Sequence, residues 1–236
     1  MDHLGSLAVV RHGQSTGNVT AQDAEENGLE AIDIPERDAD VPLSDTGREQ
    51  AEAVGRWVAE NPPDVVIVSP YLRTRQTARI ALGGRPMRVD ERLRDRELGV
   101  LDLLTARGVE ARLPDEAARR RRLGKFYYRP PGGESWADVL LRLRALLGEL
   151  RQDHPGGRVL LFAHEATVLL VRYLLEELDE ERLMTVARGT TIANASISSW
   201  RRAGDRWRPE LFNHVEHLHA EGTPPTRQED VNAEPV

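Results

Sequence analysis

Chemically capable side chains follow three short apolar runs of this sequence. The first run leads directly into Arg11 and His12, and a later one leads into His164. Between them, a third run ends at Ser69 and is followed by Arg73. Guanidinium groups bind oxyanions through paired N–H donors, and imidazoles can donate to an oxyanion or attack it. These residue types, each just after an apolar run, predict a site that binds an anion and reacts with it.

Apolar runs and helical patterns alternate along the chain. The runs are typical of buried strands and cover residues 7–10, 65–68, 159–162 and, more weakly, 192–197. Helical patterns cover residues 46–60, 71–82, 135–150 and 167–178. Thr46 with Glu49 and Ser135 with Asp138 predict capping boxes at two helix starts. This alternation predicts an α/β fold with a mostly parallel central sheet and helices on both faces.

The predicted sheet brings the chemically capable loops together. In an open parallel sheet, ligands bind outside the carboxyl ends of the strands, where all three loops would converge. Two helices would also begin there, and their free N–H groups favour a negative ligand. We therefore expect a phosphate site at this edge of the sheet.

Phosphoryl transfer assigns roles to the loop residues. An in-line attack needs an uncharged nitrogen, and the neighbouring Arg11 favours neutral His12 by lowering its pKa. Arg11 and Arg73 match the phosphoryl oxygens, whose negative charge is spread in the transition state. His164 and the backbone N–H of Glu165 are candidate donors to the same oxygens.

The leaving group and the rest of the substrate need further contacts. A leaving alkoxide must be protonated, and the candidate acids are Asp95, Glu97 and Glu134, with Asp95 preferred. Gln14 lies in the donor-rich loop after His12 and is a candidate substrate contact. These assignments describe an enzyme that works through a phosphorylated histidine with neither a metal nor an organic cofactor.

A set of short motifs is spread over most of the chain: Arg11-His12-Gly13, Asn18, Leu43-Ser44, Gly47, Gln50-Ala51, Ser69-Pro70, Arg73, Thr77-Ala78, residues 93–99, Gly133-Glu134-Ser135, His164 and Asn194-Ala195-Ser196. In this order and at these distances they resemble the motifs of the histidine phosphatase superfamily, the phosphoglycerate mutase-like proteins. The resemblance implies a three-layer sandwich in which His12 is phosphorylated, Arg11, Arg73 and His164 bind the phosphate and Asn18 adds a contact.

Three features distinguish the sequence within that resemblance. The family acid is usually a Glu four residues before the glycine matched to Gly99, and here that position is Asp95. The segment after Asn18 differs from the signature of the glycolytic mutases. Residues 127–135 are similar to a stretch of fructose-2,6-bisphosphatase domains, which makes Tyr128, Arg129 and Glu134 candidate contacts to a sugar phosphate.

The expected function is hydrolysis of small phosphomonoesters, with sugar phosphates among the candidates. Cofactor-dependent phosphoglycerate mutase is the alternative with the same chemistry. A non-catalytic module that binds a partner through the phosphate pocket is the alternative from a different class.

Composition limits the other possibilities. The chain has 236 residues, 39% of them hydrophobic, with a formal net charge of -7 and no cysteine. These values predict one domain over residues 1–220, exclude disulfides and cysteine nucleophiles, and argue against general nucleic-acid binding. With no long apolar run or signal-like start, we expect no membrane contact and a cytoplasmic monomer or homodimer.

Four other segments favour interpretations without catalytic chemistry. Residues 20–41 show little periodicity and predict a lid or a solvated loop. Residues 221–236 lack an apolar face and predict a disordered or surface-draped tail. Arg119 to Arg122 follow two acidic residues on a predicted helix and favour a solvated face over a nucleic-acid patch. His214, His217 and His219 lack a carboxylate pattern that would favour a metal site.

Overall fold

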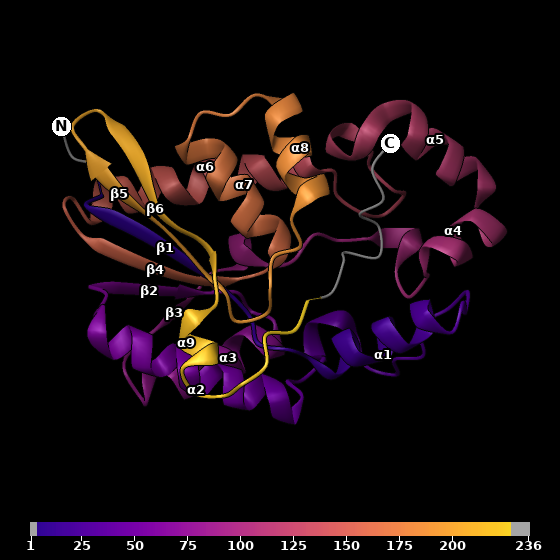
Figure 1. Cartoon of the computed structure of the whole chain (residues 1–236). Helices are drawn as coiled ribbons and strands as arrows, with labels where there is room; N and C mark the ends of the chain where they lie inside the picture. Colours follow the sequence, from indigo (N-terminus) through magenta and orange to yellow (C-terminus); the bar gives the residue numbers. More distant parts are fainter. Residues whose placement is uncertain (1–3, 228–236) are drawn as a thin grey trace.

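A central six-stranded sheet organises the molecule, whose computed structural model describes residues 4–227 (Figure 1). The strand order is β3-β2-β4-β1-β5-β6. The first four strands of that order run parallel, whereas β5 is antiparallel to both β1 and β6. The predicted mostly parallel sheet is therefore confirmed. The strands are β1 (Ser6–Arg11), β2 (Val65–Val68), β3 (Arg88–Val89), β4 (Arg158–Ala163), β5 (Ile197–Ala203) and β6 (Arg206–His214).

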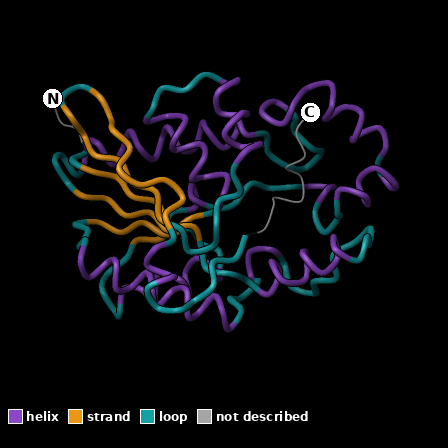
Figure 2. Tube along the Cα trace, in the orientation of Figure 1, coloured by secondary structure: helices purple, strands orange, loops and turns teal. Residues whose placement is uncertain are grey.

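Helices cover both faces of the sheet, and the predicted three-layer sandwich is confirmed (Figure 2). One face packs against α2, α3 and the short α9, and the other against α6, α7 and α8. Helices α1, α4 and α5 lie beyond the end of the sheet. The helices are α1 (Thr16–Glu26), α2 (Asp45–Glu60), α3 (Leu72–Leu82), α4 (Ala106–Arg112), α5 (Pro114–Tyr127), α6 (Trp136–Asp153), α7 (Glu165–Leu175), α8 (Glu180–Gly189) and α9 (Glu216–His219).

The central strands are buried on both faces, which explains their unbroken apolar sequences. Val9 and Leu161 point into the core under α6 and α7, whereas their neighbours Val10 and Phe162 point into the core under α2 and α3. This alternation has the period of two expected for a strand. The strands predicted over residues 7–10, 65–68 and 159–162 are confirmed within one residue at each end.

The strand predicted over residues 192–197 is wrong, because β5 begins only at Ile197. The residues before it form an irregular segment in which Ala195 has a φ of 56°, outside the range of a strand. Strand β6 was not predicted. It is an edge strand whose residues are exposed or only half-buried, and it therefore carries no apolar run.

Two helix starts test the predicted capping residues. The capping box at the start of α6 is confirmed, with Ser135 and Asp138 bonded reciprocally. The start of α2 was placed too late, because the N-cap is Ser44 rather than Thr46. The Ser44 hydroxyl accepts a hydrogen bond from the Gly47 N–H at 3.0 Å.

The segment predicted as an excursion, residues 20–41, is partly helical. It begins within α1 and returns over the end of the sheet through a bridge between Ala31 and Leu104. A short 3₁₀ turn follows at Asp38–Asp40. Ile32, which is buried, donates its N–H to the carbonyl of Leu103 at 2.9 Å. The segment is thus fixed against the loop after Gly99.

The C-terminal segment packs against the domain as far as Arg227. Thr223 is buried, and the Thr226 hydroxyl and the Pro224 carbonyl both accept from the side chain of Gln50 on α2. Of the two alternatives predicted for the tail, residues 221–227 fit the one in which it lies against the domain. Residues 228–236 lie outside the described part of the chain.

The described residues, 4–227, also bear on two predictions: a solvated face at Arg119 to Arg122 and the lack of a membrane-spanning helix. Arg119, Arg121 and Arg122 on α5 are exposed, as expected for a solvated face. Over the same residues, none of the helices combines the length and apolar character needed to cross a membrane.

Candidate active site

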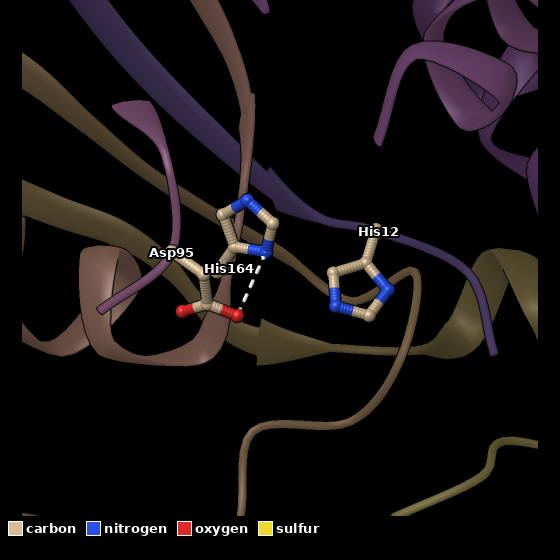
Figure 3. A group of neighbouring side chains, drawn as sticks. All are labelled: His12, Asp95 and His164. Carbon is tan, nitrogen blue, oxygen red and sulfur yellow. Dashed lines mark ion pairs between the residues drawn. The ribbon is translucent and has the colours of Figure 1, made fainter. Parts of the chain in front are cut away.

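A cavity opens where β1, β2 and β4 end, at the edge predicted from the sequence. The segment from α1 to Val41 and the loop over residues 95–104 form its outer wall. Four of the five residues predicted as catalytic line it, namely Arg11, His12, Arg73 and Asp95, and the predicted contacts Asn18 and Glu165 line it as well. The fifth, His164, adjoins His12 and Asp95 without lining the cavity. Figure 3 shows His12, Asp95 and His164 pointing toward one another, with one ligand atom of each within 4.8 Å of the others.

His12 is held with one ring nitrogen available. Its Nδ1 lies 2.8 Å from the Gly13 carbonyl, which can only accept, so Nδ1 carries the proton and Nε2 the lone pair. The side chain is buried. Burial, followed by the charges of Arg73, His164 and Arg11, holds the pKa of His12 well below its usual value. Neutral His12 with a free Nε2 is the form needed for attack on phosphorus.

Close backbone packing fixes the loop that carries His12. A Cβ on Gly13 would meet the Gly47 carbonyl, and one on Gly47 would meet the Gln14 carbonyl. The loop therefore lies directly against the first turn of α2, and glycine is required on both sides. The Gly13 N–H also donates to the Thr77 hydroxyl of α3 at 3.0 Å. The His12 loop thus contacts two helices, α2 and α3.

His164 is fully buried, at the start of α7. Ser69 Oγ accepts a hydrogen bond from the Tyr71 N–H and lies 2.8 Å from His164 Nε2. The Ser69 hydroxyl therefore donates its proton to His164 Nε2, which accepts it. His164 Nδ1 then bears hydrogen and lies 3.1 Å from Asp95 Oδ2. Burial lowers the pKa of His164 and outweighs the opposite effect of Asp95. A neutral imidazole with Nδ1–H toward the site is a donor suited to a phosphoryl oxygen.

Arg11 is buried at the end of β1. One terminal nitrogen donates to the Ile192 carbonyl and lies 3.8 Å from Glu165 Oε2. Its Nε has no hydrogen-bond partner although it is buried. A buried guanidinium donor without a partner is costly, and a phosphoryl oxygen in the cavity could accept from it.

Arg73 is buried between two carboxylates. Its NH1 donates to the carbonyl and the carboxylate of Asp38, at 2.6 and 2.8 Å, and its NH2 donates to Asp95 Oδ2 at 3.0 Å. Burial opposes the charge, but Asp38 and Asp95 outweigh it and raise the pKa of Arg73. The sequence analysis missed Asp38, since the aperiodic segment around it gave no signal.

Asp95 is the one candidate acid that faces the cavity. Burial would raise its pKa, but His164, Arg73 and His12 hold the pKa of Asp95 well below its ordinary value. Since both imidazoles are neutral near pH 7, Arg73 is the cation that keeps the carboxylate ionised. Asp95 therefore needs a proton supplied with the substrate before it can act as an acid.

The other two candidate acids lie outside the cavity. Glu97 is exposed and accepts from the Tyr71 hydroxyl at 3.0 Å. Glu134 is buried against Arg142, whose Nε and NH2 each donate to it at 3.0 Å, and it also pairs with Arg94. Glu134 thus holds the loop of Asp95 through its contacts with Arg94 and Arg142, and neither Glu97 nor Glu134 lines the cavity.

The predicted sugar-phosphate contacts also face elsewhere. Tyr128 is buried among Leu101, Val109 and Ala117, and its hydroxyl donates to Glu116 at 2.8 Å. Arg129 is exposed and donates its Nε–H to the Gly133 carbonyl at 3.1 Å. Neither lines the cavity. In the stretch similar to fructose-2,6-bisphosphatase domains, these two residues therefore make their contacts outside the cavity.

Of the remaining predicted contacts, two of three face the cavity. Asn18 accepts on Oδ1 from the Ser15 N–H at 3.0 Å, which leaves its amide N–H₂ for a ligand. Glu165 lines the cavity and accepts from the Ile192 N–H at 3.1 Å. Gln14 does not line it, because its side chain accepts from the Ser44 hydroxyl at 2.8 Å.

A hydrogen-bonded chain behind the site reaches the C-terminal segment. Asn194 donates from Nδ2 to the His12 carbonyl at 3.3 Å and to Asn18 Oδ1 at 3.1 Å. Its Oδ1 accepts from the Thr226 hydroxyl at 3.0 Å, which in turn accepts from Gln50 Nε2. Asn194 was noted only as part of the family resemblance, and nothing in the sequence pointed to Thr226.

Two groups of side chains combine residue types that can bind metal ions: the histidines near the C-terminal end, and His12 with Asp95 and His164. His217 donates Nε2–H to the Ala195 carbonyl at 3.0 Å, and burial lowers the pKa of His217 to about 4, so this ring is engaged in packing. Within residues 4–227, His12, Asp95 and His164 are the set that could converge on a metal ion. The guanidinium groups of Arg11 and Arg73 line the same cavity, and Arg73 already binds Asp95. Their positive charge favours an anion there.

Comparison with known proteins agrees with this geometry. The pattern of the histidine phosphatase superfamily (branch 1) matches residues 7–215. Glucosyl-3-phosphoglycerate phosphatase of Mycobacterium tuberculosis is 30% identical over 86% of each chain, and 2,3-bisphosphoglycerate-dependent phosphoglycerate mutase 2 of Gloeobacter violaceus is 32% identical over 78% of this chain and 81% of its own. The structure of a mycobacterial glucosyl-3-phosphoglycerate phosphatase with VO3 has a TM-score of 0.71 and 29% identity, covering 88% of this chain and 98% of that one. The chain therefore belongs to the histidine phosphatase superfamily, branch 1, as an enzyme of the phosphatase type.

Proposed function

We propose that the protein hydrolyses small phosphomonoesters in two steps through phosphorylated His12. The observation that carries the proposal is the buried, neutral His12, whose Nδ1 is bonded to the Gly13 carbonyl and whose Nε2 is free. Arg11, Arg73 and His164 around it supply the donors that a phosphoryl group requires.

In the first step, His12 Nε2 forms a bond to phosphorus as the bond from phosphorus to the ester oxygen breaks. Arg73 turns from Asp38 and Asp95 toward the phosphoryl oxygens, and the phosphate charge raises the pKa of Asp95. Asp95 takes the proton that the substrate brings as a monoanion and passes it to the leaving alkoxide. The products are the alcohol and phosphorylated His12.

In the second step, water attacks the phosphorylated histidine. Asp95, now a carboxylate, accepts a proton from the water as its oxygen bonds to phosphorus, and the bond to His12 Nε2 breaks. Asp95 returns this proton to the phosphate, which leaves as the monoanion, and the site regains neutral His12 and ionised Asp95. The same carboxylate thus serves both steps.

The test uses purified protein and labelled phosphomonoester, quenched within a turnover. We expect release of inorganic phosphate and a protein-bound phosphate that is labile in acid and stable in alkali, as a phosphoramidate is. For the mutase alternative, which similarity to the Gloeobacter protein favours, a coupled assay measures 3-phosphoglycerate isomerisation with and without 2,3-bisphosphoglycerate. Isomerisation faster than phosphate release would replace hydrolysis with mutase activity. A folded protein with neither activity would favour a non-catalytic binding module.

Chelation is expected to leave the rate unchanged. Arg11 and Arg73 already provide the positive charge that a metal ion would supply to the phosphoryl oxygens. The measurement compares initial rates of 4-nitrophenyl phosphate hydrolysis before and after dialysis against EDTA. A loss of rate that one divalent ion restores would contradict this expectation.

Replacing Thr226 with valine is expected to lower kcat with little change in KM. The variant keeps the size of the side chain but removes the donor to Asn194 Oδ1 and leaves Gln50 Nε2 with the Pro224 carbonyl alone, so the loop of His12 and Asn18 is held less firmly. Because small misplacements of a nucleophile are costly, we expect a decrease of about tenfold. Thr226→Ser retains the hydroxyl and serves as the matched control. Equal kcat values in the valine and serine variants would show that Thr226 does not position the loop.

A further inference from the structure

Beyond the groups that would hold phosphate, the cavity is lined mainly by aliphatic side chains. They come from two segments that the bridge between Ala31 and Leu104 joins into one wall. The aliphatic residues of this wall are Ala21, Ile32, Ile34, Val41, Leu98, Leu103 and Leu104. Such a wall stabilises a bound apolar group in proportion to the apolar surface of wall and group that binding buries.

Leu103 stands out in this wall. Its φ is 58°, in the left-handed region that leucine rarely adopts, and 37% of the residue is exposed. The Asp102 carboxylate accepts its N–H at 3.1 Å, and Ile32 donates to its carbonyl, so the conformation is held from both sides. A large aliphatic side chain is thereby kept at the cavity rather than in the core.

The side chains that line the cavity carry more negative than positive charges. Five carboxylates line the cavity against three guanidinium groups, and Arg11 and Arg73 are the two that face the phosphate position. The third, Arg96, is buried and donates its Nε–H to the Glu134 carbonyl at 2.7 Å. Four of the carboxylates lie on the outer wall: Asp38 and Asp95 bind Arg73, and the other two are Glu36 and Asp102. A second anionic group on the substrate would meet repulsion there.

From this wall and these charges, we infer that the cavity selects phosphate esters of apolar alcohols without an anionic group and discriminates against alcohols that carry a carboxylate. The inference rests on the proposed hydrolysis at His12 and specifies the substrate class of that site. Arg11, Arg73 and His164 bind the phosphoryl group common to all substrates, whereas the aliphatic wall and the two outer carboxylates that do not bind Arg73 distinguish the alcohols.

The first test compares two aryl esters that differ in one charge. The probes are the phosphate esters of methyl 4-hydroxybenzoate and of 4-hydroxybenzoate itself, measured as kcat/KM. We expect the native enzyme to prefer the methyl ester by about tenfold or more, because its carboxylate is masked. In the double variant Glu36→Gln, Asp102→Asn we expect that ratio to fall by about fivefold. Asp102→Asn keeps the oxygen that accepts the Leu103 N–H.

Asp33→Asn is the matched control, because Asp33 is an exposed carboxylate of the same segment that does not line the cavity. It should leave the ratio unchanged. A native enzyme that prefers the carboxylate ester, or a double variant with an unchanged ratio, would overturn the inference.

The second test measures the apolar wall with an alkyl series from ethyl to hexyl phosphate. We expect kcat/KM to rise by about threefold for each added methylene until the wall is filled. Leu103→Asn removes the aliphatic group with a residue that tolerates positive φ, and it should flatten the rise. Val100→Asn, an exposed position nearby that does not line the cavity, should leave it intact. A native series without any rise would also overturn the inference.

Failure of this inference can be told apart from failure of the proposed function. Turnover of 4-nitrophenyl phosphate that depends on His12 tests the reaction alone, because its small aryl group carries no carboxylate. If that turnover is present but the preference between the two aryl esters or the rise along the alkyl series is not as expected, the proposed hydrolysis stands and the inferred substrate class is wrong. If it is absent, the proposed hydrolysis itself is wrong.

Discussion

Replacing His12 with alanine is expected to lower kcat for any phosphomonoester by about 10⁴-fold or more. The imidazole is the group that bonds to phosphorus in the proposed reaction, and His164 cannot take its place. His164 Nε2 is bonded to Ser69, and Nδ1 faces Asp95. The measurement is initial-rate turnover of 4-nitrophenyl phosphate together with the acid-labile protein-bound phosphate, and both should disappear.

The His12→Ala protein is expected to remain folded, because backbone contacts hold its loop. Gly13 donates to Thr77, and the His12 carbonyl accepts from the Ala195 N–H at 3.1 Å, neither of which uses the imidazole. Thermal unfolding should confirm this. His219→Ala, at an exposed histidine far along the chain, is the matched control and should keep native activity. A folded His12→Ala protein with substantial turnover would end the proposal that His12 is the nucleophile.

The sequence predicted those parts of the fold that are buried on both sides. Strands β1, β2 and β4 lie inside the sheet with a helical layer on each face, so every residue of their central stretches is apolar. Strand β6 lies at the edge and is half-exposed, so its composition resembles that of a loop. Residues 192–196 show the opposite failure, since Ile192 and Ala193 are buried beside the site without forming a strand.

In the candidate site, the sequence predicted correctly the side chains that directly follow the ends of buried strands. Arg11, His12 and His164 follow buried strands directly, so parallel topology alone brings them together. Which way a loop side chain turns depends on distant partners. The sequence makes Glu134 a candidate acid, but Arg142 on the next helix binds both of its oxygens. Asp38 contacts Arg73 only because residues 20–41 fold back over the end of the sheet, and no local sequence pattern predicts that path.

Replacing Asp95 with asparagine is expected to lower turnover of an alkyl phosphate by about 10²- to 10⁴-fold, the usual contribution of a general acid. An alkoxide leaves poorly unless it is protonated, whereas 4-nitrophenolate is stable enough to leave almost unaided. The loss on 4-nitrophenyl phosphate should therefore be much smaller. The measurement is kcat for both substrates in the native and variant enzymes, with Glu97→Gln as the matched control because Glu97 lies outside the cavity.

The dependence on pH gives an independent check of the same assignment. The pKa of Asp95 is lowered in the empty site, so the carboxylate is ionised at neutral pH and the proton must enter with the monoanion of the substrate. For an alkyl phosphate, kcat/KM should then fall as the pH rises above about 6, the second pKa of a phosphate monoester. Asparagine cannot take up that proton, so the alkaline limb should weaken in Asp95→Asn. Equal losses on both substrates with an unchanged limb would mean that Asp95 only positions Arg73 and His164, and a selective loss in Glu97→Gln would move the acid to that residue.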